Sequence, residues 1–237
     1  MRGLRKAGLR RRPASSLPRP APRVFGVDGA AGRGFGAGRA RGRAQGSDKP
    51  VTVRTLFARL NAFLRPTTTV VADVGDALFG AADLFLHHHT EFLAPAYYTS
   101  MGFAIPAAVG AQLARPSSRP LVLVGDGAFL MTGLELATIV RYQLNPIVVV
   151  LNNRGYGTER PMQDGPFNDL PALHHHRFPE LLGAGRGFVV HTERDLNAAL
   201  IAAEQHTETF CLIEVRLDPH DRSPALQRLT ARMAKSI

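Results

Sequence analysis

Three short, largely apolar runs of residues constrain the fold of this chain more than any other feature. They are residues 121–124 (LVLV), 147–151 (IVVVL) and 210–215 (FCLIEV). Runs of this length read as buried strands, and strands that are apolar on both faces are typical of parallel sheets covered by helices. Segments with helical spacing alternate with the strands. The sequence therefore predicts an α/β fold with a doubly wound, mostly parallel sheet and helices on both of its faces.

The remaining elements follow the same alternation. Additional strands are predicted at residues 67–75 and 187–190, and helices at residues 51–64, 101–114, 132–143, 193–205 and 223–235. Asn145 and Pro146 are expected to end the helix at residues 132–143.

The first 50 residues differ in composition from the rest of the chain. They carry 13 Lys or Arg and two Asp, whereas residues 51–237 carry 16 basic and 17 acidic residues. They are rich in Arg, Gly, Ala and Pro and lack apolar periodicity, so they cannot bury enough surface to offset the entropy of ordering. We therefore expect a disordered tail at residues 1–50 and one domain at residues 51–237.

Three interpretations of this tail compete. An Arg-rich, acid-poor start is typical of organelle transit peptides, and Arg-Gly segments such as residues 32–43 can bind RNA. The third interpretation is an extension without function. We favour the third, because only Phe25 and Phe35 supply the aromatic rings on which bases stack. Nucleic acid is therefore not expected as a partner.

Cysteine content and hydropathy bear on the compartment. The single cysteine, Cys211, excludes a disulfide framework and fits a reducing compartment, so a cytoplasmic location is expected. No apolar stretch approaches the roughly 20 residues that span a bilayer, and no membrane partner is expected.

Polar residues follow two consecutive predicted strands. Asp126, between Gly125 and Gly127, comes directly after the strand at residues 121–124, and Asn152 and Asn153 end the strand at residues 147–151. Ligands bind at the carboxyl ends of strands in such sheets, so neighbouring strands would bring these side chains together. Carboxylate and amide oxygens suit Mg²⁺, and glycines with a helix N-terminus suit a phosphate group. Taken alone, the aspartate between two glycines would be an ordinary turn, and the asparagine pair would be an ordinary helix stop.

These motifs resemble the diphosphate-binding signature of thiamine-diphosphate enzymes. The stretch NNRGYGTE (residues 152–159) is similar to the NN-x-G-Y-x-x-E pattern of 2-oxo acid decarboxylases of the pyruvate and indolepyruvate type. DVGDALFG (residues 73–80) and YTSMGFAIPAAVGAQ (residues 98–112) also resemble that family. The resemblance covers residues 65–217 in matching order and implies thiamine diphosphate and Mg²⁺ as cofactors.

The resemblance also implies roles for individual residues. Mg²⁺ would be bound by Asp126, Asn153 and the Gly155 carbonyl. Met101 would hold the cofactor in its bent conformation, and the Thr99 carbonyl would accept from its pyrimidine amino group. Glu159 would be the catalytic residue that handles protons around the substrate carboxylate. Further cofactor contacts are implied for Gly75, Asp76, Gly125, Gly127, Ala128 and Tyr156.

Two positions differ from the pattern of the family, and two histidine runs need a separate interpretation. Asp76 and Ala128 stand where many family members place hydroxyl groups near the diphosphate, and an aspartate there would repel phosphate unless it points away. The two triple-histidine runs at residues 87–89 and 174–176 suggest metal binding. Adjacent histidines point in different directions, however, so we interpret both runs as loop residues.

The resemblance implies that the site is incomplete in this chain. Enzymes of this type place the cofactor between two kinds of domain, and residues 1–50 do not resemble the missing pyrimidine-binding domain. We therefore expect part of an enzyme that decarboxylates 2-oxo acids, such as the aromatic indolepyruvate, to aldehydes. We also expect little activity from this chain alone, and a homo- or hetero-oligomer with exposed apolar surface. Alternatives are an acetolactate-synthase-like carboligase, or a non-catalytic assembly module with a nucleic-acid-binding tail.

Overall fold

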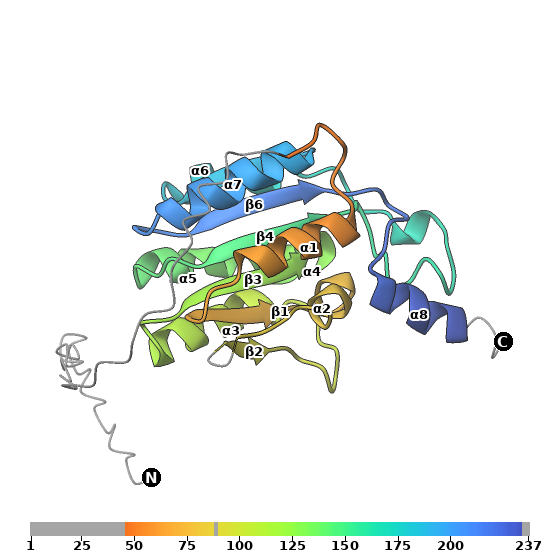
Figure 1. Cartoon of the computed structure of the whole chain (residues 1–237), viewed down its shortest axis with the longest axis horizontal. Helices are drawn as coiled ribbons and strands as arrows, with labels where there is room; N and C mark the ends of the chain where they lie inside the picture. Colours follow the sequence, from red (N-terminus) through yellow and green to blue (C-terminus); the bar gives the residue numbers. More distant parts are fainter. Residues whose placement is uncertain (1–45, 88–89, 234–237) are drawn as a thin grey trace, which may run out of the picture. The chain divides into compact units, whose positions relative to one another are not determined.

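A six-stranded parallel sheet forms the centre of the computed structural model, which describes residues 46–87 and 90–233 (Figure 1). The strands are β1 (Thr68–Ala72), β2 (Glu91–Leu93), β3 (Arg119–Gly125), β4 (Ile147–Asn152), β5 (Arg186–Val190) and β6 (Cys211–Arg216). Their order across the sheet is β2-β1-β3-β4-β6-β5, and every neighbouring pair is parallel. The predicted fold class is confirmed.

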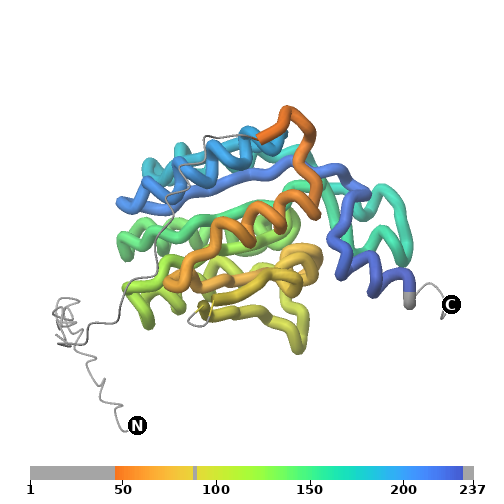
Figure 2. The backbone as a smooth tube through the Cα atoms, viewed as in Figure 1, coloured from red at the N-terminus to blue at the C-terminus, as the bar shows by residue number. Residues whose placement is uncertain are grey.

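Helices cover both faces of this sheet (Figure 2). The helices are α1 (Val53–Phe63), α2 (Asp76–Ala81), α3 (Ala104–Ala114), α4 (Asp126–Thr132), α5 (Leu136–Arg141), α6 (Phe178–Leu182), α7 (Glu193–Gln205) and α8 (Pro224–Met233). One core joins α1, α2 and α7 to one face, and a second core joins α3, α4 and α5 to the other. Successive strand residues serve opposite cores, because side chains alternate along a strand: Leu121 belongs to the first and Val122 to the second.

The strand order places a topological switch point between β1 and β3. The chain leaves β1 toward β2 at one edge, and it leaves β3 toward β4 on the opposite side. The strands β3 and β4 are direct neighbours, with Gly125 paired to Leu151. The polar residues that follow both strands therefore emerge at the same edge of the sheet, next to the crevice where ligands bind in such folds.

Several element boundaries differ from the sequence prediction. The helix expected at residues 132–143 begins earlier, at Asp126, and a 3-10 turn (Gly133–Glu135) separates α4 from α5. Gly127 and Gly133 lower the helix propensity of this segment, but burial of Ala128 and Phe129 against the sheet stabilises the helix. The elements β2, α2 and α6 were not predicted, because each is short.

The helix expected from residue 101 begins at Ala104 instead. Gly102 has a φ of 84°, a left-handed conformation that stops a helix from extending toward residue 101. The buried carboxylate of Asp73 accepts hydrogen bonds from the backbone N–H of Gly102 (3.1 Å) and of Ala104 (2.8 Å). Asp73, at the end of β1, therefore fixes both the start of α3 and the turn that holds Met101.

The start of the described region contacts the body of the domain. The backbone N–H groups of Glu193 and Arg194 donate to the carbonyls of Lys49 and Ser47, and Pro50 bridges to Thr192. Most of the predicted tail, residues 1–45, lies outside the described residues, so the boundary at residue 50 stays a prediction. No helix of the described residues is both long and apolar enough to cross a membrane.

Candidate functional site

A cavity of about 290 Å³ opens at the carboxyl ends of β1, β3 and β4. The structure brings all twelve candidate site residues to this one cavity. They are Gly75, Asp76, Thr99, Met101, Gly125, Asp126, Gly127, Ala128, Asn153, Gly155, Tyr156 and Glu159. Their individual roles stay predictions, but segments distant in the sequence form a single site.

Asp126 joins the two strand ends on which the site is built. Its carboxylate is buried and accepts hydrogen bonds from the backbone N–H of Gly127 (2.8 Å) and of Gly155 (3.1 Å). Burial raises the pKa of this carboxyl group above its ordinary value, and these hydrogen bonds offset only part of the effect. No lysine or arginine of the described chain forms an ion pair with it. A cation at this place would stabilise the ionised form.

The two consecutive asparagines have different surroundings. Asn152 is buried, and its amide donates to Glu214 on β6 at 2.6 Å, away from the cavity. Asn153 lines the cavity and is only half buried. The next residue, Arg154, has a φ of 59°, so the chain turns sharply here. Of the pair, only Asn153 is placed to contact a ligand in the cavity.

The opposite wall comes from the segment that follows β1. Gly75 has a φ of 77°, and a Cβ there would lie 3.0 Å from the hydroxyl of Thr158, so glycine fits both the turn and the space. Asp76 accepts from the backbone N–H of Ser223 (2.8 Å) through Oδ2, while Oδ1 has no partner among the described residues. Burial raises the pKa of Asp76. One carboxylate oxygen thus accepts a hydrogen bond at the start of α8, while Asp76 still lines the cavity.

Thr99 and Met101 line the cavity from the turn before α3. Thr99 has a φ of 52°, a strained conformation for a β-branched residue, and its hydroxyl donates to the Tyr98 carbonyl at 2.7 Å. Strain of this kind is concentrated at ligand-binding sites, and here the surrounding turn maintains it.

Arg160 holds the loop that carries Gly155, Tyr156 and Glu159. Its side chain is 7% exposed and pairs with Asp164 (2.9 Å) and Asp169 (2.6 Å). Asp169 in turn forms an isolated bridge with Gly155. Sequence reasoning missed this contact, for which the i, i+4 spacing of Arg160 and Asp164 was the only available signal. Glu159 lies at the exposed rim of the cavity.

The second triple-histidine run forms part of a 3-10 turn (His175–Arg177), where a loop was expected. His175 is buried and packs edge to face against Phe129, with the ring centroids 5.2 Å apart, and His176 lies within hydrogen-bond distance of Glu214. In the first run, residues 88 and 89 lie outside the described part, and His87 is exposed. No group of three or more His, Cys, Asp or Glu suited to a metal ion occurs among the described residues.

Comparison with known proteins identifies the family of this chain. Residues 73–215 match the family described as "Thiamine pyrophosphate enzyme, C-terminal TPP binding domain". The chain belongs to this family, and the cofactor predicted from the sequence, thiamine diphosphate, is confirmed at the level of the family.

Three similar proteins are named as decarboxylases. An "Alpha-keto-acid decarboxylase" of Mycolicibacterium paratuberculosis is 36% identical over 72% of this chain and 31% of its own length. A protein of the same name from Mycobacterium bovis is 35% identical over 79% of this chain and 34% of its own length. The solved thiamine diphosphate-dependent 4-hydroxybenzoylformate decarboxylase of Rhodococcus jostii matches with a TM-score of 0.65 and 29% identity, over 73% of this chain and 34% of that one. The chain thus spans about a third of the length of these relatives.

Proposed function

We propose that this chain forms the diphosphate- and Mg²⁺-binding part of an enzyme that decarboxylates 2-oxo acids to aldehydes. The observation that carries the proposal is the meeting of Asp126, Asn153 and Gly155 in one cavity at the ends of two adjacent strands. Similarity to proteins named alpha-keto-acid decarboxylase supports the reaction type.

The available ligands fit a hard cation. Asp126 offers a buried carboxylate, Asn153 an amide oxygen and Gly155 a backbone carbonyl, and Mg²⁺ prefers such oxygen ligands. Three protein oxygens leave room for diphosphate oxygens and water in a shell of about six. A soft metal is disfavoured, because the cavity is lined by neither histidine nor cysteine among the described residues.

Of the other cavity residues, most are proposed to bind the cofactor and one, Glu159, to take part in the chemistry. Gly75, Gly125, Gly127 and Ala128 let the backbone approach a diphosphate closely, at the beginnings of α2 and α4. We assign Met101 and the Thr99 carbonyl to holding the two cofactor rings, and Tyr156 to packing beside Gly127, where a Cβ would lie 2.7 Å from its ring. When bound, the thiazolium ring supplies the electron sink for loss of carbon dioxide. Glu159 would hold and move a proton at its carboxylate near the substrate.

The site is proposed to be completed by a pyrimidine-binding domain, in a homo- or hetero-oligomer in the cytoplasm. The side chains of Leu130, Met131 and Leu134, on α4 and the turn after it, are exposed and apolar, as a docking surface requires. We propose an aromatic 2-oxo acid as substrate, by analogy with the Rhodococcus jostii relative, whose name states an aromatic substrate.

Calorimetry tests the binding function directly. Thiamine diphosphate titrated into the full chain with Mg²⁺ should release heat with a Kd in the micromolar to millimolar range, and binding should vanish in EDTA. Adding a candidate partner that carries a pyrimidine-binding domain should tighten binding and produce aldehyde from a 2-oxo acid. Binding that does not depend on Mg²⁺ would contradict the metal assignment.

Gly157 offers a test of the Asn153 assignment. A Cβ at this position would overlap Nδ2 of Asn153, so Gly157→Ala should displace the side chain and raise the Kd for thiamine diphosphate and Mg²⁺ at least roughly tenfold. Gly110→Ala is the matched control, because no atom lies within 4 Å of its Cβ position in α3 and its cofactor Kd should not change. Equal Kd values in both variants would remove Asn153 from the site.

A further inference from the structure

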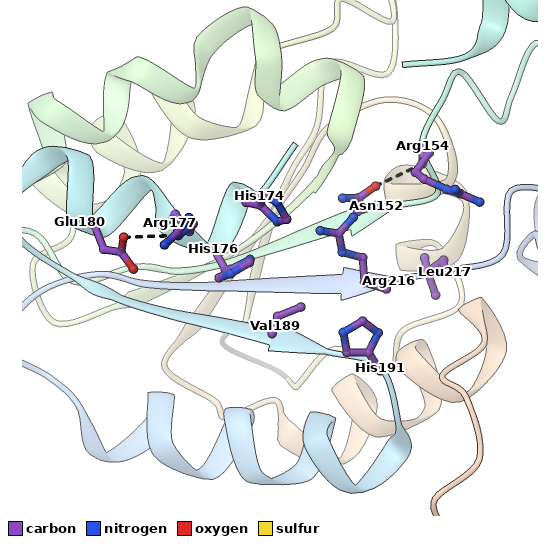
Figure 3. A pocket seen from close by; sticks show the side chains of 10 residues that line it. All are labelled: Asn152, Arg154, His174, His176, Arg177, Glu180, Val189, His191, Arg216 and Leu217. Carbon is purple, nitrogen blue, oxygen red and sulfur yellow. Dashed lines mark hydrogen bonds and ion pairs between the residues drawn. The ribbon is translucent and has the colours of Figure 1, made fainter. Parts of the chain in front are cut away.

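A second, larger hollow lies beside the cofactor cavity, at the carboxyl ends of β4, β5 and β6 (Figure 3). We call it the arginine groove, and its volume is about 750 Å³. It is lined by Asn152, Arg154, His174, His176, Arg177, Glu180, Val189, His191, Arg216 and Leu217. Leu217 also lines the cofactor cavity, so the two sites are neighbours. None of the roles proposed for the cofactor site uses the basic residues of this groove.

A buried carboxylate organises the floor of the arginine groove. Glu214 is fully buried and accepts from Arg216 (3.0 Å), from the backbone N–H of His176 (3.0 Å) and from the amide of Asn152 (2.6 Å). The Nδ1 atom of His176 also lies 2.6 Å from it. These contacts with Glu214 hold the side chains of Arg216 and His176 in place before a ligand binds.

The groove retains unused positive charge. Arg216 uses Nη2 for Glu214 and for the Leu173 carbonyl (3.2 Å), while its Nε and Nη1 donate to no acceptor in the described chain. The guanidinium of Arg154 forms no ion pair with the described residues, and Arg177 meets only Glu180, at 3.4 Å on the surface. Guanidinium groups bind phosphate and carboxylate through paired hydrogen bonds.

Histidine rings and apolar side chains line the arginine groove next to the arginines. The rings of His174 and His176 have their centroids 5.7 Å apart, and Val189 and Leu217 add apolar area. Figure 3 shows the side chains of the arginine groove coming from the ends of β4, β5 and β6, from the segment that leads into α6 and from α6 itself. A volume in the range of ordinary ligand sites, about 300–1,000 Å³, exceeds what a single phosphate ion needs.

We propose that the arginine groove binds a nucleotide, a ligand that combines phosphate groups with a flat ring. The phosphates would pair with Arg154, Arg177 and Arg216, and the ring would lie on the histidine and apolar surfaces. This site needs no metal, because the protein itself supplies the positive charge. It does not depend on the function proposed for the neighbouring cavity.

Titration of the full chain with ADP in EDTA tests the proposal, because EDTA removes the metal that the cofactor cavity needs. ADP should bind with a Kd below about 1 mM, adenosine should bind much more weakly, and affinity should fall with added salt. The double variant Arg154→Gln/Arg177→Gln should raise the Kd at least roughly tenfold. Both side chains are exposed, so the fold should be retained, with an unchanged melting temperature.

Two controls separate this site from others. Arg65→Gln removes a guanidinium of similar exposure (56%, against 63% for Arg177) at the opposite end of the sheet, and ADP affinity should be unchanged. Asp126→Asn should also leave ADP binding intact in EDTA. The proposal is overturned if ADP does not bind without metal, or if the double variant binds it as tightly as the parent chain. Loss of ADP binding in Asp126→Asn would likewise overturn it, by placing ADP in the cofactor cavity.

Discussion

Asp126→Asn should raise the Kd of the chain for thiamine diphosphate and Mg²⁺ by about a hundredfold or more. The substitution keeps the size of the side chain and an oxygen that can accept a backbone hydrogen bond, but it removes the carboxylate charge at the junction of β3 and β4. A divalent ion next to a diphosphate depends on that charge, because no other carboxylate of the described residues occupies the same junction. Calorimetry with the cofactor and Mg²⁺ measures the change.

The stability of the same variant provides an internal check. Because burial raises the pKa of Asp126, ionising this group above its unfolded pKa works against folding. Without cofactor, any stability that Asp126→Asn gains from losing the buried charge should be present only above the unfolded pKa, and the loss of one of the two backbone hydrogen bonds offsets part of it, because an amide offers a single acceptor oxygen. Asp83→Asn, at an exposed carboxylate, is the matched control for cofactor affinity. A Kd within about threefold of the parent value would contradict the metal assignment.

Glu214→Gln should lower the free energy of unfolding by about 3 kcal/mol at pH 7, since it removes the charge that balances a buried group of donors. The carboxylate lies inside β6, paired with Val150 of β4, and accepts from Arg216, His176 and Asn152. Urea unfolding measures the loss. Glu204→Gln removes a half-exposed partner of Arg65 and should cost no more than about 1 kcal/mol. Equal effects of the two changes would show that the network adds nothing.

The pH dependence of this loss has a definite sign. Burial raises the pKa of Glu214, but hydrogen bonds from His175, His176 and Asn152 outweigh burial and bring the pKa well below its usual 4.5. A lowered pKa contributes stability that is complete above the unfolded value and declines as pH falls toward the folded one. The contribution of the Glu214 carboxylate to the difference between the parent chain and Glu214→Gln should therefore shrink once pH falls below about pH 4.5. A difference that grows as pH falls below about pH 4.5 would contradict this assignment.

The sequence was sufficient for features that depend on local pattern. The apolar runs at residues 121–124 and 147–151 predicted two strands of a parallel sheet, and the polar residues after them predicted a shared cavity on the condition that these strands are neighbours, which the structure shows. The metal itself stays a proposal, but the convergence of Asp126 and Asn153 follows from the parallel direction of β3 and β4 together with their adjacency in the sheet.

Features that depend on long-range pairing were not predictable. Glu214 stands within an apolar run and attracted no interpretation, although a charge inside a buried strand signals a paired partner. Its role became visible only once β6 lay beside β4, which brings it to Asn152 and to the turn with His175. For the same reason, the sequence could not show that the two consecutive asparagines serve different sites.

The strand order of the parallel sheet also determines when this domain can complete its folding during synthesis. Its central strand β4 is flanked by β3 and β6, and β6 ends close to the last described helix, with Leu151 paired to Val215. A nascent chain that has left the ribosome only as far as α7 would carry β4 with one side open, a surface that chaperones and neighbouring nascent chains recognise. Both hollows would therefore take shape after translation has passed residue 216, and premature termination before that point would yield an aggregation-prone product rather than a weaker binder.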